Sequence, residues 1–200
     1  MADNLRLPTR KPLLFLLLDP IMYLHGLLFG KLGGRMYEVG ALLVYDTTGV
    51  CRVDDIGIPE GMSLQDKTRK YYKLSPVFGS GTIYIPVDTR VFMRPVISRE
   101  EAETLIRKIP EIQEEDTCDI HNQKVLEDHY KASIHTHECK DLVQLIKTVY
   151  AKERKLEQRG KKTGKMDQQY MKRAKELLHG ELAAALEIPI DDVEGYISGV

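Results

Sequence analysis

The spacing of the apolar residues changes at Ser98, and this change limits the folds open to the chain. Before Ser98, apolar residues fall in short runs separated by glycine-containing turns, as in β-strands. After Ser98 they recur every three or four residues, as on one face of a helix. A chain of 200 residues can form one medium domain or two small ones. We therefore predict an α+β fold, with a β domain over residues 36–97 and an all-α helical domain over residues 98–200.

The β domain is expected to contain several short strands. The segment 36–40 opens with a strand pattern, and further strands are expected over residues 41–46, 50–58, 70–74 and 82–87. No helical pattern lies between them, which is typical of a small antiparallel sheet or barrel. A module of roughly 60 residues is close to the lower limit for independent folding, so we expect it to pack on the segment that follows.

The helical domain begins with a capping box. Ser98 and Glu101 have the spacing at which a hydroxyl and a carboxylate satisfy the free N–H groups of a first helical turn. Pro110 ends this helix. Further helices are expected over residues 122–134, 140–158 and 166–186, with a short last helix from Asp191.

Residues 1–35 differ from the rest of the chain. Their apolar run, residues 12–29, is broken by Asp19-Pro20 and His25-Gly26, whereas a membrane helix needs roughly 20 uninterrupted apolar residues. The codons for residues 33–35 would resemble a purine-rich ribosome-binding site just before Met36. We hypothesise that the natural protein starts at Met36 and that residues 1–35 are an extension of the gene model. N-terminal sequencing tests this, and no membrane association is expected.

Charge is unevenly distributed along a chain whose net charge is only −1. Residues 98–128 carry ten acidic and four basic side chains, whereas residues 145–175 carry eleven basic and three acidic ones. A basic surface of this kind suits contact with phosphates without reading of bases, although solvated helix faces are the simpler alternative. The residues predicted to contact DNA are Lys140, Lys147, Arg154, Arg159, Lys161, Lys162 and Lys165.

Three stretches carry a family resemblance, namely residues 37–40 with 43–45 and 49–50, residues 85–88 with 93–98, and residues 173–175 with 180–183. Taken in order, they resemble the CarD family of bacterial transcription regulators. This family includes the CdnL proteins and the polymerase-binding module of transcription-repair coupling factor. The resemblance spans roughly residues 36–197.

The resemblance implies a Tudor-like β-barrel that binds the RNA polymerase β subunit through a sheet edge. It also implies a helical domain that approaches promoter DNA near the upstream edge of the open bubble. Many relatives insert a tryptophan wedge into DNA, but this chain has no Trp, and Val125 or Leu126 stands at that position. The candidate polymerase-binding residues, for which a place in the barrel core is the alternative, are Val44, Tyr71, Tyr72 and Tyr84.

The remaining motifs favour a protein that is not an enzyme. The glycines at 79 and 81 lack the lysine of a phosphate-binding loop, so neither a cofactor nor a small-molecule substrate is expected. Three cysteines at irregular spacing fit a reducing cytoplasm. The alternatives are a protein-only adaptor or RNA-binding module, or a small metalloenzyme. Zinc ligands are available at His129, His135, His137, Cys118 and Cys139, but their spacing is not that of a structural zinc site, and we predict no metal.

Overall fold

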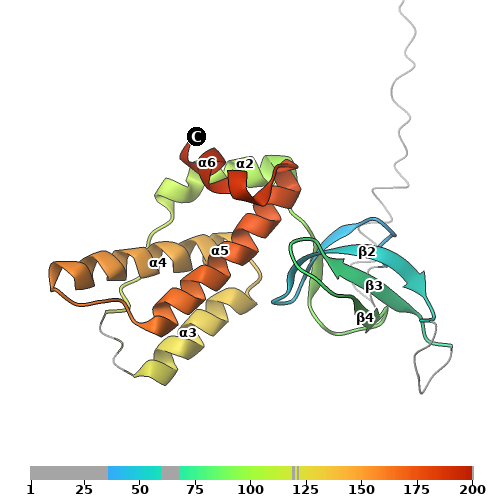
Figure 1. The fold of residues 1–200 in the computed structure, drawn as a ribbon, viewed down its shortest axis with the longest axis horizontal. Helices are drawn as coiled ribbons and strands as arrows, with labels where there is room; N and C mark the ends of the chain where they lie inside the picture. The colour runs from blue at the N-terminus through green and yellow to red at the C-terminus, as the bar shows by residue number, and fades with distance from the viewer. Residues whose placement is uncertain (1–35, 60–67, 119, 121, 200) are drawn as a thin grey trace, which may run out of the picture. The chain divides into compact units, whose positions relative to one another are not determined.

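The computed structural model describes residues 36–59, 68–118, 120 and 122–199 (Figure 1). The hypothesis that residues 1–35 are not native falls outside these described residues. From Tyr37 onward the chain forms one structural unit. Within the described ranges, no helix combines the length and the apolar character needed to cross a membrane.

An antiparallel sheet forms the first part of this unit, and its strand order is β4-β3-β2-β1-β5. The first four strands agree with the predicted ones, whereas β5 was not predicted. The sheet is not closed, because β4 and β5 are its two edges and do not pair with each other among the described residues. The Tudor-like barrel is therefore not confirmed. The strands are β1 (Leu42–Tyr45), β2 (Gly49–Gly57), β3 (Tyr71–Pro76), β4 (Ile83–Pro86) and β5 (Met93–Pro95).

The strand predicted for residues 36–40 is wrong, because this segment turns instead. Gly40 has a φ of +89°, which a glycine adopts without steric cost. The N–H of Tyr37 donates to the Tyr72 hydroxyl at 2.9 Å, and the Tyr37 hydroxyl donates to the Met93 carbonyl at 2.9 Å. These two bonds and a backbone bond, donated by the Gly40 N–H to the Val53 carbonyl at 2.7 Å, hold the segment on the sheet without a strand of its own.

The predicted helices all form, and the capping box is confirmed. Ser98 Oγ accepts the Glu101 N–H at 3.2 Å, while the Ser98 N–H donates to Glu101 Oε2 at 2.7 Å. Pro110 lies in a short 3-10 turn, η2, directly after the first helix. The helical elements are α2 (Arg99–Lys108), η2 (Ile109–Glu111), α3 (Gln123–His135), α4 (Cys139–Gln158), α5 (Lys165–Leu186), η3 (Ile190–Asp192) and α6 (Val193–Ser198).

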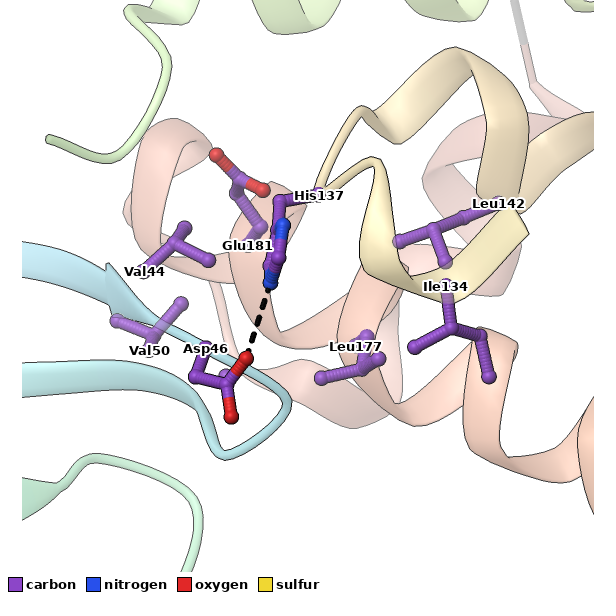
Figure 2. A pocket seen from close by; sticks show the side chains of 9 residues that line it. Val44, Asp46, Val50, Ile134, His137, Leu142, Leu177 and Glu181 are labelled. Carbon is purple, nitrogen blue, oxygen red and sulfur yellow. Dashed lines mark hydrogen bonds and ion pairs between the residues drawn. The ribbon is translucent and has the colours of Figure 1, made fainter. Parts of the chain in front are cut away.

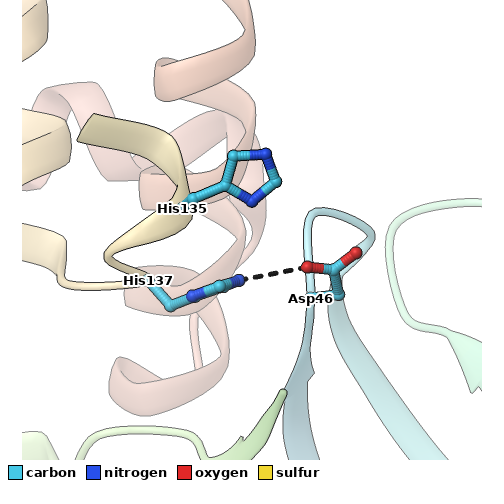
Figure 3. A group of neighbouring side chains, drawn as sticks. All are labelled: Asp46, His135 and His137. Atoms are coloured by element: carbon cyan, nitrogen blue, oxygen red, sulfur yellow. Dashed lines mark hydrogen bonds and ion pairs between the residues drawn. The ribbon is translucent and has the colours of Figure 1, made fainter. Parts of the chain in front are cut away.

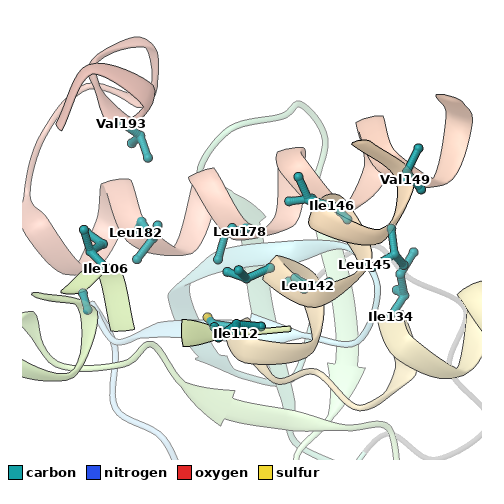
Figure 4. Packing of buried hydrophobic residues seen from close by; sticks show 14 of the residues in the cluster. Ile106, Ile112, Ile134, Leu142, Leu145, Ile146, Val149, Leu178, Leu182 and Val193 are labelled. Atoms are coloured by element: carbon teal, nitrogen blue, oxygen red, sulfur yellow. The ribbon is translucent and has the colours of Figure 1, made fainter. Parts of the chain in front are cut away.

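The helices pack around α5, the longest of them (Figure 4). Leu142, Ile146 and Val149 recur along α4 and meet Leu178 and Leu182 of α5. Full burial of one such aliphatic side chain contributes about 1.5–3 kcal/mol relative to exposure. A second, separate cluster lies in the sheet; its members are Leu43, Cys51, Val53, Tyr72, Leu74 and Ile85.

Thiol accessibility provides a first test of this packing. Cys51 and Cys139 are buried, whereas Cys118 is partly exposed. Burial raises the pKa of the Cys51 thiol to about 11 and also raises that of Cys139. In a thiol titration of the native protein at pH 8, we expect Cys118 to react and the two buried thiols to react only after unfolding. Fast reaction of two thiols in a Cys118→Ser variant would contradict the packing.

Candidate protein and nucleic-acid interfaces

A buried ion pair joins the sheet to the helices. Glu181 of α5 has only 3% of its side chain exposed, and both of its oxygens accept hydrogen bonds from Arg94 of β5. The Ile97 N–H donates to Glu181 Oε1 at 3.1 Å, and Cys139 Sγ donates to Oε2 at 3.1 Å. Burial acts to lower the pKa of Arg94, but the Glu181 carboxylate outweighs it and the pKa is raised. Arg94 therefore stays charged and fixes β5 against α5.

We call the region where β1, β2 and β5 meet α3 and α5 the joint. Beside the ion pair, apolar side chains fill the joint (Figure 2). Val44 and Val50 of the sheet face Ile134 and Leu177 of the helices, around a cavity of about 10 Å³. That volume holds about one water molecule, so the joint leaves no room for a larger ligand. Gly49 has a φ of +97°, and a side chain there would meet Leu177 Cδ2 at 3.3 Å.

A second close approach involves the turn between β3 and β4. A Cβ added at Gly180 of α5 would lie 3.2 Å from the Phe78 ring. Glycine in the middle of a helix costs about 1 kcal/mol relative to alanine. The contact with Phe78 gives this glycine a packing role, since it lets the turn approach the helix backbone.

The predicted polymerase-binding residues separate into two pairs. Tyr72 lies in the sheet core, and Val44 is buried in the joint, so neither can contact a partner while the fold is intact. Tyr71 and Tyr84 instead share a surface hollow of about 280 Å³ with Lys73. The direct contacts predicted for Val44 and Tyr72 are corrected accordingly, and the candidate set reduces to Tyr71 and Tyr84.

Strand β4 offers a sheet edge beside this hollow. Among the described residues, β4 pairs only with β3. The Val87 N–H donates to the Lys70 carbonyl at 3.1 Å, directly after β4. Peptide groups alternate in direction along an antiparallel ladder, so those of Tyr84 point away from β3. Tyr84 therefore presents both its backbone groups and a 40% exposed side chain to a partner.

Lys147, one of the predicted DNA contacts, is already engaged within the protein. Its Nζ donates to the carbonyl oxygens of Ile109 at 3.0 Å and Pro110 at 3.4 Å, and also to that of Ile112. These carbonyls belong to the C-terminal end of the first helix and the turn after it, where a cation is favourable. The prediction that Lys147 contacts DNA is therefore replaced by a structural role.

The other predicted basic residues are exposed and lie at two places. Lys140 is in the first turn of α4, close to the joint, and Arg154 is 14 positions further along the same helix, about 21 Å away. Arg154 belongs to a group around the α4–α5 turn that makes no ion pair with any described residue, whereas Lys152 and Lys155 pair with Asp167 and Asp116. We call this group the basic tip; it consists of Arg154, Arg159, Lys161, Lys162 and Lys165.

Of the two possible wedge residues, only Val125 projects from the fold. Leu126 is 5% exposed and belongs to the helical core, which excludes it as a wedge. Val125 is 53% exposed in the first turn of α3. Further along α3, the Tyr130 hydroxyl donates to Asp167 Oδ1 in the first turn of α5 at 2.7 Å. This contact holds the middle of α3 against the first turn of α5, which also contains Lys165 of the basic tip.

The residues of the joint were not identified as a pair from the sequence. One signal was present: Glu181 lies between Leu178 and Leu182 on the apolar face of α5, where an acidic side chain needs a buried partner. Its partner could not be named, because Arg94 is 87 positions away along the chain.

Comparison with known proteins gives one assignment. Residues 37–97 match the family model of the CarD-like/TRCF RID domain. The match ends at Ile97, directly before the N-cap of α2. No match to the chain was found among curated proteins.

Proposed function

We propose that this chain, whose residues 37–97 belong to the CarD-like/TRCF RID domain family, is a non-enzymatic transcription regulator that binds RNA polymerase. In this proposal residues 37–97 bind the β subunit of the polymerase, and residues 98–200 contact promoter DNA near the upstream edge of the open bubble. The observation that carries it is the family match, which covers the sheet and its exposed β4 edge. A bacterial polymerase as partner implies a cytoplasmic protein.

The β4 edge fits the addition of a strand from a partner. Main-chain hydrogen bonds to an edge strand supply affinity, and alternate side chains supply specificity. Tyr84 meets both requirements, because its peptide groups point outward and its ring is exposed beside Tyr71. Aromatic residues of this kind are enriched among the residues that dominate binding energy at interfaces.

The basic tip fits a second, weaker contact with DNA phosphates. Its five exposed cations can release counterions from a duplex without reading base edges. Val125, which is exposed in the first turn of α3, is an aliphatic candidate for insertion at a base step. The joint holds the helices on the sheet, so binding of the sheet to polymerase would deliver the basic tip to promoter DNA. The regulator would then change the lifetime of the open complex through binding alone.

The polymerase contact is tested by substitution of Tyr84 with alanine. We expect the affinity for RNA polymerase to fall by about tenfold or more, since truncation of a central aromatic at an interface costs about 2 kcal/mol. Tyr150→Ala is the matched control, because Tyr150 is also 40% exposed but lies in α4. Binding of the full chain to immobilised polymerase measures both variants. Equal retention of the Tyr84 and Tyr150 variants would contradict the assigned surface.

A further inference from the structure

Three potential metal ligands converge at the joint (Figure 3). Asp46 lies in the turn between β1 and β2, His135 ends α3, and His137 lies in the link between α3 and α4. Each offers one ligand atom, and these atoms all lie within 4.8 Å of one another. His137 Nε2 is 3.2 Å from Asp46 Oδ1. Donors from the sheet and from the helices thus face a common point.

The donor types and their spacing suit a transition metal ion. Two imidazoles and one carboxylate are a usual ligand set for zinc, with bonds of about 2.0–2.2 Å. Ligand atoms in a tetrahedron with such bonds stand roughly 3.3 Å apart, close to the 3.2 Å between His137 and Asp46. His135 is exposed at a helix end, so rotation about its side-chain bonds can bring its ring nearer.

His137 is held in place by a ring contact and by a hydrogen bond to its backbone. Its ring stacks on Phe92 at 4.0 Å between centroids and 14° between planes. Its carbonyl accepts a hydrogen bond from Arg94 at 2.6 Å. His137 and Asp46 both have positive φ values, of 59° and 41°, which few residues other than glycine adopt. The surrounding structure therefore fixes the direction of this imidazole, as outer-shell contacts do in metal sites.

The two arginines near these three side chains are both paired with carboxylates, which reduces their repulsion of a bound cation. Arg94 is neutralised by Glu181, and Arg173, which donates to the carbonyl of Thr47, is paired with Glu176 at 2.9 Å. The Asp46 carboxylate adds an oxygen donor of negative charge to the two imidazoles.

We propose that Asp46, His135 and His137 bind a divalent transition metal ion, with Zn²⁺ as the favoured ion, which clamps the β1–β2 turn to the α3–α4 link. Three protein ligands leave a fourth position for water. Of the zinc ligands considered in the sequence, this site keeps His135 and His137. Cys139 and His129 are engaged elsewhere, because Cys139 Sγ donates a hydrogen bond to Glu181 and His129 is paired with Glu115 at 2.8 Å. The proposal is independent of polymerase or DNA binding.

Equilibrium dialysis of the chelator-treated full chain against ZnCl₂ tests the site. We expect one Zn²⁺ per chain, and at least tenfold weaker binding in His135→Gln, His137→Asn and Asp46→Asn, since even loss of an outer-shell contact costs about 10–100-fold. Asparagine at 137 tolerates the positive φ, and circular dichroism checks the fold of each variant. His129→Gln is the control and should bind like the unaltered chain. No zinc uptake, or uptake by His135→Gln equal to that of the unaltered chain, would overturn the site.

Hydrogen exchange separates the clamp from simple binding. Zn²⁺ should slow amide exchange at residues 46–49 in the unaltered chain and leave it unchanged in His135→Gln. If zinc binds with one-to-one stoichiometry while exchange in this turn stays the same, the clamp is overturned.

Discussion

Replacement of Glu181 with leucine is expected to lower the free energy of unfolding by about 3–5 kcal/mol, because it leaves the largely buried Arg94 guanidinium without its counterion. The loss includes the acceptor for the Ile97 N–H and for Cys139 Sγ, and buried donors left unpaired are costly. Urea denaturation followed by circular dichroism measures the change. A decrease of this size is a large share of the total stability of a domain.

The matched control is Glu157→Leu, which changes the same residue type at an exposed position of α4. We expect a change within about 0.5 kcal/mol for this control, as for most surface substitutions. The double variant Arg94→Met with Glu181→Leu should recover much of the loss, because apolar side chains can replace a buried ion pair. Equal effects of the Glu181 and Glu157 substitutions would mean that the ion pair does not hold the sheet against the helices.

The elements of the fold were largely predictable because their signals are local. The capping box at Ser98 and the apolar spacing of α4 and α5 each depend on residues a few positions apart. Strand β5 was missed because a three-residue strand containing Pro95 has no periodicity of its own. It forms because its backbone pairs with that of β1 in an antiparallel arrangement. The expected closed barrel likewise depends on pairing between distant strands, and the edge strands β4 and β5 do not pair.

The sequence indicated which types of residue form the candidate sites, but not which of those residues reach the protein surface. The two adjacent tyrosines of β3 read alike in sequence, yet alternation along the strand buries Tyr72 and turns Tyr71 to the surface. Lys147 has the same spacing as Lys140 and Arg154, but the end of α2 happens to fold back onto it. The grouping of Asp46 with two histidines required the joint itself, because these residues come from separate elements.

Reversal of two charges in the basic tip is expected to weaken the proposed contact with DNA phosphates. Lys161→Glu with Lys162→Glu should lower the affinity for promoter DNA by about tenfold or more at low salt. It should also reduce the slope of log K against log salt concentration by about 2, since each lost phosphate contact removes about 0.9 from the slope for duplex DNA. Fluorescence anisotropy with a labelled promoter duplex over a series of salt concentrations measures both quantities.

A control with equal charge change separates a local contact from a general electrostatic effect. Lys70→Glu with Lys108→Glu alters two exposed lysines in the sheet region and in α2, away from the basic tip. If the basic tip touches the phosphates, only the variant at 161 and 162 changes the slope, whereas the control shifts affinity slightly through net charge. Parallel slopes for both variants would show that net charge alone governs binding. An unchanged slope at 161 and 162 would remove these lysines from the DNA contact and favour Lys140, at the opposite end of α4, as the place to search next.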